Sequence, residues 1–419
     1  MNKKHLPALF ACCLVLLLGC ASTRPMAKGP TADPSLGLVE KLDLIGLPKT
    51  PITKPTVWYN GNEWRDHVTE LVRGAKRYVV ITSFLASNSL PNADFYQALV
   101  DKANEGVPVY FLVDGSGLFD MTESRKSLIP LMYLTRTPIH FLETKPISAA
   151  RLVGASDFFF RYHQKVVIID GQVMAIGGMN FNYISVGAPP GKDLQRDTMY
   201  EFTSPEAVAA FLGWFIPWWN DQSWDRLDLA DFPIDYSYKQ DEPKVDAWLV
   251  NEVPGSHTIG SAYGALLSSA KESVEILPFL PALDANMMQA IKETVARGVR
   301  VSMVISYDKR TSDRYMYLPL LEAGVDMRIE PPSEKGLLHE KLMVVDDRYV
   351  MVGSSNFNVR SMALSYEICM IIDDSDLAKM VHQHYNELYD QAVYVSPEEA
   401  KQWRTFGKML MHMLMTVGG

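Results

Sequence analysis

Two stretches of the chain decide its fold: HQKVVIIDGQVMAIGGMNF at residues 163–181 and HEKLMVVDDRYVMVGSSNF at residues 339–357. Both follow the pattern His-x-Lys-x4-Asp-x6-Gly-(Gly/Ser)-x-Asn. The apolar run after each lysine predicts a buried strand, and the Gly-Gly or Gly-Ser pair ends the hairpin that follows. Two copies with the same spacing indicate an internal repeat, and a repeat constrains the architecture of the whole chain.

The repeat extends upstream of both motifs. One half contains AKRYVVITSF (75–84) followed by DFYQALVDKANEGVPVYFLVD (94–114), and the other contains AKESVEILPF (270–279) followed by ANMMQAIKETVARGVRVSMVI (285–305). Each reads as a strand, an amphipathic helix ended by glycine, and a second strand, which is a β-α-β unit. We therefore expect an α/β fold of two similar halves, each a mixed, mostly parallel sheet flanked by helices, packed with pseudo-two-fold symmetry.

The repeat also suggests the domain boundaries. The first half is expected at residues 46–232 and the second at 233–419, the latter ending in a C-terminal helix. The first half carries extra residues before its histidine, roughly at 115–162. Because a single chain contains both motifs, a monomer suffices to build a site between the halves.

The two motifs place a basic pair on each of two strands. His163 and Lys165, like His339 and Lys341, are two residues apart, and such residues of an extended segment point to the same face. Four cationic or hydrogen-bond-donating groups suit a tetrahedral phosphate. Histidine also serves as nucleophile or proton donor near neutral pH, so one can attack phosphorus while the other protonates the leaving oxygen.

Two other interpretations of the motifs are weaker. A single His-x-Lys is common by chance and usually marks a surface strand, but two copies with identical spacing exceed coincidence. A zinc site needs three or four ligands, whereas each motif supplies one histidine with no cysteine nearby, so we expect no metal.

The paired blocks resemble the HKD motifs of the phospholipase D superfamily over about residues 55–419. This resemblance implies a phosphodiester reaction through a phosphohistidine, without metal or other cofactor. It assigns the nucleophile to His163 and the general acid and base to His339, although the two roles could be reversed. It also gives phosphate-holding or supporting roles to Lys165, Lys341, Asn180, Asn356 and Ser354.

Four acidic residues accompany the motifs. Asp170 and Asp346 complete the HKD pattern, and for both a contact that orients a turn is a better interpretation than catalysis. Glu367 and Asp197 resemble the acidic residues that family members place against the histidines, where a carboxylate orients the imidazole ring. For Asp197 a position at the rim is the more credible alternative, because an insertion at 187–193 precedes it.

Shorter patterns resemble the bacterial cardiolipin synthases. These are Gly-Gly-x-Asn at 177–180, Arg-Asp-Thr at 196–198 and Asn-x3-Arg-Ser at 356–361. The resemblance implies transfer of a phosphatidyl group from one glycerophospholipid to a hydroxyl of another. Release of phosphatidic acid by a phospholipase D hydrolase remains an alternative, since a wet site would admit water instead.

The N-terminus predicts export and lipidation. MNKKHLPALFACCLVLLLGC (1–20) has a basic start and a short apolar run, typical of a signal peptide over 1–19. The ending Leu-Leu-Gly-Cys resembles a bacterial lipobox, so Cys20 would carry acyl chains that hold the protein at the membrane surface. Residues 20–45 read as a flexible tether, and Ala21, which is not aspartate, favours the outer membrane, facing the periplasm.

The net negative charge of the chain makes nucleic-acid binding a less favoured function. The 419 residues carry 40 Lys and Arg against 49 Asp and Glu, a formal charge of −9. Proteins that bind nucleic acid through its phosphates usually carry a positive charge, so no nucleic acid is expected as partner. A periplasmic metal-independent nuclease remains a further alternative, because superfamily nucleases use the same motif, and a non-catalytic envelope binding protein is a third.

Overall fold

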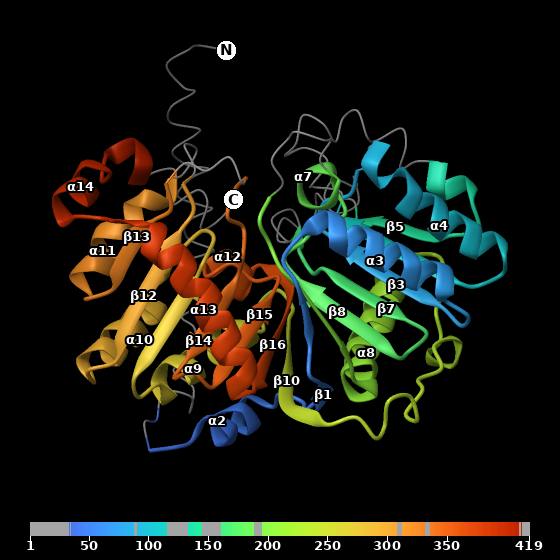
Figure 1. The fold of residues 1–419 in the computed structure, drawn as a ribbon, viewed down its shortest axis with the longest axis horizontal. Helices are drawn as coiled ribbons and strands as arrows, with labels where there is room; N and C mark the ends of the chain where they lie inside the picture. The colour runs from blue at the N-terminus through green and yellow to red at the C-terminus, as the bar shows by residue number, and fades with distance from the viewer. Residues whose placement is uncertain are drawn as a thin grey trace, which may run out of the picture.

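A computed structural model describes residues 33, 35–87, 90–114, 133–144, 161–187, 195–307, 312–331, 336–409 and 412. The predicted signal peptide and Cys20 lie outside these residues, as does most of the insertion expected at 115–162. The described residues form two mixed sheets standing side by side (Figure 1), one for each repeat. The two-half α/β fold expected from the sequence is confirmed.

The sheet of the first half lies on the right of Figure 1 and has seven strands in the order β2-β9-β8-β7-β3-β4-β5. The strands are β2 (Thr56–Trp58), β3 (Val79–Ser83), β4 (Val109–Asp114), β5 (His140–Thr144), β7 (Val166–Ile169), β8 (Val173–Gly177) and β9 (Met199–Thr203). The helices are α3 (Gly61–Gly74), α4 (Ala93–Asn104), α7 (Tyr183–Val186) and α8 (Pro205–Gln222), with short 3₁₀ turns η2 (Leu90–Asn92), η3 (Tyr133–Arg136) and η5 (Leu229–Asp231).

The sheet of the second half runs β1-β10-β16-β15-β14-β11-β12-β13-β17, and β6 joins it beside β16. The strands are β1 (Ile52–Thr53), β6 (Arg161–Tyr162), β10 (Lys244–Glu252), β11 (Ser273–Leu277), β12 (Arg300–Ile305), β13 (Asp326–Ile329), β14 (Leu342–Val345), β15 (Tyr349–Gly353), β16 (Ser365–Asp373) and β17 (Val393–Tyr394). The helices are α2 (Leu38–Ile45), α9 (Thr258–Ser269), α10 (Ala285–Ala296), α11 (Tyr317–Glu322), α12 (Val359–Ala363), α13 (Ser375–Gln391) and α14 (Pro397–Gln402), with a 3₁₀ turn η6 (Ser312–Met316).

The expectation of mostly parallel sheets is wrong in detail. Parallel pairing within each sheet's main path is confined to β3-β4-β5 and to β11-β12-β13, the two β-α-β units. The motif strands β7 and β14 each form a hairpin with the next strand, and that strand pairs antiparallel with β9 or β16. Because a tight hairpin can only join antiparallel strands, the motifs themselves impose this direction.

The two sheets share one core. Alternate residues of each strand face opposite sides, so Val80 belongs to an inward cluster that also includes residues of α8 and α13, whereas Val79 and Ile81 belong to an outward cluster with α3 and α4. The inward cluster contains buried residues of both sheets, and the outer face of the second sheet packs against α2, α9 and α10. The halves are therefore joined by a continuous apolar core rather than by a polar interface.

The N-terminal end of the body corrects the predicted tether. Residues 38–45 form helix α2, which ends at Gly46 in the left-handed conformation with φ of 79°. Leu38 and Leu42 lie one helical turn apart and are buried against α9 of the second half. Strand β1 likewise pairs with β10 of the second sheet. The four-residue spacing of the leucines was the signal for this helix.

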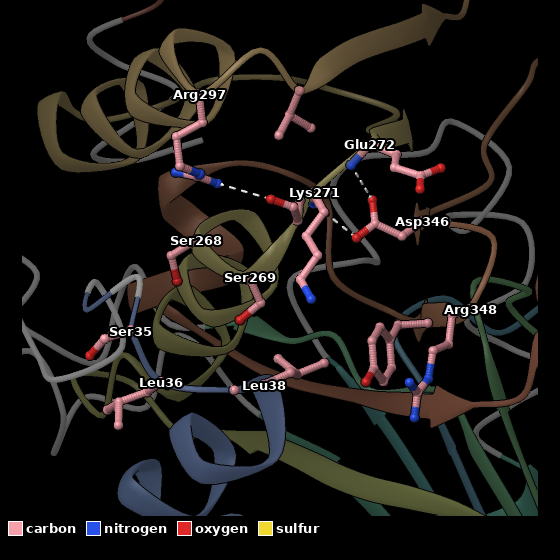
Figure 2. A pocket seen from close by; sticks show the side chains of 14 residues that line it. Ser35, Leu36, Leu38, Ser268, Ser269, Lys271, Glu272, Arg297, Asp346 and Arg348 are labelled. Atoms are coloured by element: carbon pink, nitrogen blue, oxygen red, sulfur yellow. Dashed lines mark hydrogen bonds between the residues drawn. The ribbon is translucent and has the colours of Figure 1, made fainter.

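The motif aspartates hold the turns of the two hairpins. Asp170 and Asp346 have φ of 58° and 53°, and each carboxylate accepts backbone N–H groups of the residues entering β3 or β11. Figure 2 shows the Asp346 carboxylate aimed at the backbone of Lys271 and Glu272, beside a hollow of about 650 Å³ that contains neither motif histidine. The turn-orienting interpretation thus agrees with the observed contacts.

Within the described residues, none of the helices combines the length and apolar character needed to cross a bilayer.

Candidate active site

The two motif histidines lie where the halves cross. His163 lies three positions before the first residue of β7, and His339 lies three positions before the first residue of β14. The backbone N–H of His163 donates to the carbonyl of Tyr366 at 2.9 Å, and that of His339 donates to the carbonyl of Arg196 at 2.8 Å. Each motif therefore begins by pairing with the other half, at β16 for His163 and at the segment that precedes β9 for His339, which brings both imidazoles to the interface.

Each histidine takes its carboxylate from the other half. Nδ1 of His163 lies 2.9 Å from Oε2 of Glu367, and Nδ1 of His339 contacts Oδ2 of Asp197. Both carboxylates are 1% exposed. The rim interpretation of Asp197 is therefore wrong: the insertion before it lies upstream of the strand, and Asp197 sits at the buried entry to β9.

The two carboxylates are seated differently, and the motif glycine explains why. Glu367 accepts hydrogen bonds from the hydroxyls of Ser354 at 2.5 Å and Ser361 at 2.7 Å. At the position matching Ser354 the first half has Gly178, where an added Cβ would lie 2.1 Å from Oδ1 of Asp197. The second glycine of the first motif thus leaves room for the Asp197 carboxylate, whereas the serine of the second motif donates a hydrogen bond to Glu367.

The motif lysines lie beside the motif histidines. Nζ of Lys165 donates to the carbonyl of His163 at 2.6 Å, and Nζ of Lys341 donates to the carbonyl of His339. Nζ of Lys341 also lies 2.8 Å from Nδ1 of His339 and 3.8 Å from Oδ2 of Asp197. Both lysines are buried, so their ammonium groups are held beside the imidazoles rather than in solvent.

Two phenylalanines that the sequence analysis did not single out, Phe84 and Phe279, contact the motif histidines and lysines. The ring of Phe84 lies 5.0 Å from that of His163 and 5.6 Å from Nζ of Lys165. The ring of Phe279 lies 4.2 Å from that of His339 and 4.7 Å from Nζ of Lys341. These phenylalanines end the matched stretches 75–84 and 270–279, so their equivalence was the signal available in the sequence.

Burial and the closeness of several cationic groups shift the pKa values of the motif histidines and lysines and of Glu367. Burial, reinforced by the lysines, holds the pKa of His163 well below its usual value and lowers the pKa of His339 to about 3. Burial likewise lowers the pKa of Lys165 to about 7 and of Lys341 to about 8, and raises that of Glu367 to about 7. Burial therefore favours the neutral form of both imidazoles, and a bound phosphate would favour protonation of the lysines.

The motif asparagines occupy unlike positions. Oδ1 of Asn180 accepts the backbone N–H of Leu85 at 3.0 Å, directly after Phe84. Oδ1 of Asn356 is buried and has no hydrogen-bond partner among the described residues. A phosphate-binding role for either amide stays a prediction. Asp170 and Asp346 lie at the far ends of β7 and β14, away from the histidines.

No group of three or more His, Cys, Asp or Glu side chains in the described part of the chain is placed to hold a metal ion.

Comparison with known proteins agrees with this geometry. The family model described as "Cardiolipin synthase, PLD-like domain" matches residues 68–219 and 263–389, one segment in each half. The chain belongs to this family. The membership confirms a phospholipase D-superfamily enzyme built from two like halves, as the paired motifs predicted.

Individual relatives share low sequence identity with this chain, but the similarity covers most of its length. The chain is 24% identical over 396 residues to cardiolipin synthase 1 of Bacillus anthracis, covering 91% of this chain and 74% of the relative. It is 24% identical over 388 residues to cardiolipin synthase A of Pseudomonas aeruginosa, covering 89% and 75%. The crystal structure of phosphatidylserine synthase from Haemophilus influenzae matches with a TM-score of 0.68 at 14% identity, covering 90% of this chain and 98% of that one, which shows a shared fold.

A substitution at Gly178 tests the contact between Asp197 and His339. Gly178→Ala places a methyl group against the Asp197 carboxylate and should displace it from His339, lowering kcat at least about 100-fold, within the range of lost general acid–base catalysis. The measurement is steady-state turnover of a phosphodiester lipid, with circular dichroism to verify folding. The matched control is Gly213→Ala, since an added Cβ at Gly213 meets nothing within 4 Å. Equal turnover in the two variants would refute the assignment.

Proposed function

We propose that this chain is a phosphatidyltransferase of the cardiolipin synthase kind, acting on glycerophospholipids through a phosphohistidine. The observation that carries the proposal is the pair of buried histidines, each bound through Nδ1 to a buried carboxylate of the other half. The names of the relatives, cardiolipin synthases from several bacteria, supply the substrate class.

The first half-reaction cleaves the donor lipid. A carboxylate on Nδ1 fixes the ring and leaves Nε2 of that histidine as the nitrogen that attacks phosphorus. The new P–N bond forms as the bond from phosphorus to the head-group oxygen breaks. The partner histidine, having gained a proton as substrate binds, gives it to the departing oxygen, so the head-group alcohol leaves neutral.

The second half-reaction reverses these steps with a new alcohol. The partner histidine, now neutral, takes the proton from the hydroxyl of a second lipid, and that oxygen attacks phosphorus. The P–N bond breaks and the first histidine is restored. Lys165 and Lys341 stabilise the negative charge that builds on the phosphoryl oxygens, because they are buried beside both rings.

A lipid product assay tests this function. The purified protein is incubated with phosphatidylglycerol in mixed micelles, and the lipids are identified by mass spectrometry. We expect cardiolipin and free glycerol, and His163→Ala and His339→Ala should each reduce turnover by at least about 1,000-fold, since each removes a required nucleophile or proton carrier.

Products other than cardiolipin would indicate a different reaction. Phosphatidic acid alone would show a hydrolase and refute the transfer. Metal-independent plasmid nicking with no lipid product would show a nuclease instead. Undiminished turnover in either histidine variant would refute the two-histidine mechanism.

We also propose that the protein is lipid-anchored at the envelope through Cys20, with the outer membrane facing the periplasm as its place. The support is the lipobox-like sequence ending at Cys20. The described body begins its first helix at Leu38. Eighteen residues span at most about 60 Å when extended, so the tether would keep the enzyme close to its membrane.

Metabolic labelling with palmitate in a bacterial host checks the anchor. Wild-type protein should incorporate label and sediment with membranes, whereas Cys20→Ser should incorporate none, because the variant lacks the acceptor thiol. The variant should retain turnover on detergent-solubilised lipid, since Cys20 precedes the catalytic body. Equal labelling of both proteins would overturn the proposal.

A further inference from the structure

The residue between His339 and Lys341 of the second motif is bound by a helix on the opposite face. This residue is Glu340, and its side chain points away from its two neighbours because successive residues of an extended segment alternate in direction. The carboxylate is buried, and both of its oxygens lie 3.0 Å from Nε2 of His384 on α13. One side-chain contact therefore connects the motif backbone to α13.

The segment that carries His339 lies outside regular secondary structure. It follows the β-bridge between Leu338 and Arg196 and ends where β14 begins. The backbone N–H of His339 donates to the carbonyl of Arg196. Because Glu340 is the next residue, an anchor on its carboxylate limits the tilt of this backbone, and hence the position of the His339 ring against Asp197.

The first motif has a neutral side chain at the matching position, Gln164. Its amide nitrogen donates to Oδ1 of Asn251 at 2.6 Å and to the backbone carbonyl of Glu367 at 3.1 Å. Its amide oxygen accepts the hydroxyl of Tyr162 at 2.8 Å. An amide carries no charge at any physiological pH. Of the two motifs, the second is therefore the one with an ionisable anchor.

Titratable groups from both halves face the His384 ring. They are Glu340 and Glu387 from the second half, and from the first half Tyr59, whose ring lies 4.6 Å away, and Arg196, which is paired with Glu330. Tyr200 of β9 lies within electrostatic range of Glu340, but burial holds its pKa well above its usual value, so it remains uncharged.

The balance of these groups favours the charged form of His384. Burial opposes the imidazolium, but the hydrogen bond and charge of Glu340, together with Glu387, raise the pKa of His384 above the ordinary value of 6.5. The side chain is 25% exposed, so the ring exchanges its proton with solvent. A raised pKa means that protonation strengthens the contact with Glu340, and that the contact weakens as pH rises through this pKa.

We infer that His384 is a positioning residue for the reaction: as imidazolium it holds Glu340, and through Glu340 the backbone that orients His339. The inference rests on the proposed function and adds a residue that acts through another. When His384 loses its proton, the buried Glu340 carboxylate loses its cation, which favours movement of that carboxylate toward water. Turnover then depends on a proton that lies outside the catalytic pair.

The test compares pH profiles rather than single rates, because the motif histidines and lysines titrate as well. kcat is measured on phosphatidylglycerol in mixed micelles, from mildly acidic to alkaline pH, for wild-type protein and for His384→Asn. The ratio of the two values cancels the titration that both proteins share. It should be at least about tenfold below the pKa of His384, within the range for a misplaced catalytic group, and should fall toward one above it, with KM unchanged.

His382→Asn is the matched control on the same helix. Nδ1 of His382 lies 2.7 Å from Oε2 of the buried Glu275 and 3.3 Å from Oδ1 of Asp347, which follows the end of β14 that is distant from His339. This variant also removes a helix histidine that binds a buried carboxylate, but at the other end of the strand. Its kcat should equal that of the wild type at every pH.

Two further variants separate positioning from packing. A guanidinium keeps its charge throughout this pH range, so His384→Arg should retain turnover at acidic pH and exceed the wild type at alkaline pH. In a Glu340→Gln background, His384→Asn should have no further effect, because the shared contact is already lost. Circular dichroism verifies that each variant is folded.

Two results would overturn the positioning role: a wild-type to His384→Asn ratio that is constant across pH, or an equal ratio for His382→Asn. A wild-type protein that releases phosphatidic acid in place of cardiolipin would overturn the proposed transfer alone, because its turnover still gives the ratio. A wild-type protein that forms neither product would overturn both.

Discussion

The site depends on one exchange across the interface: the imidazole of each half is held through Nδ1 by a carboxylate of the other half. An isolated half would keep its His-x-Lys strand but lose the group that orients the ring. The shared apolar core around α8 and α13 fixes the two sheets against each other and so maintains both contacts. Packing at the centre of the molecule and orientation of the reacting groups are therefore one constraint.

Burial of the histidines, lysines and carboxylates shifts their pKa values. Two lysines and two histidines lie buried beside two buried carboxylates, and desolvation is the leading cause of every pKa shift described for them. Cations crowded out of water favour their neutral forms. In the proposed reaction a phosphate would supply the missing negative charge, and a neutral histidine would be a competent nucleophile.

The sequence predicted what is periodic or repeated. The two β-α-β units, the hairpins and the paired motifs follow from local patterns, and Glu367 could be placed by its strand. Three features depend on contacts between distant segments, which a local sequence pattern does not predict. The antiparallel pairing of β9 with β8 and of β16 with β15, the burial of Asp197 and the docking of α2 all arise from tertiary packing.

Nitrogen-15 NMR of the imidazole rings tests the central claim most directly. In protein labelled at histidine, with His163→Gln and His339→Gln spectra for assignment, both motif histidines should be neutral at pH 7 with the proton on Nδ1. Asp197→Asn should alter the His339 resonances and leave those of His163 in place, because the carboxylate acts across the interface. Imidazolium resonances for both rings at pH 7, or a change confined to His163 in Asp197→Asn, would contradict the account.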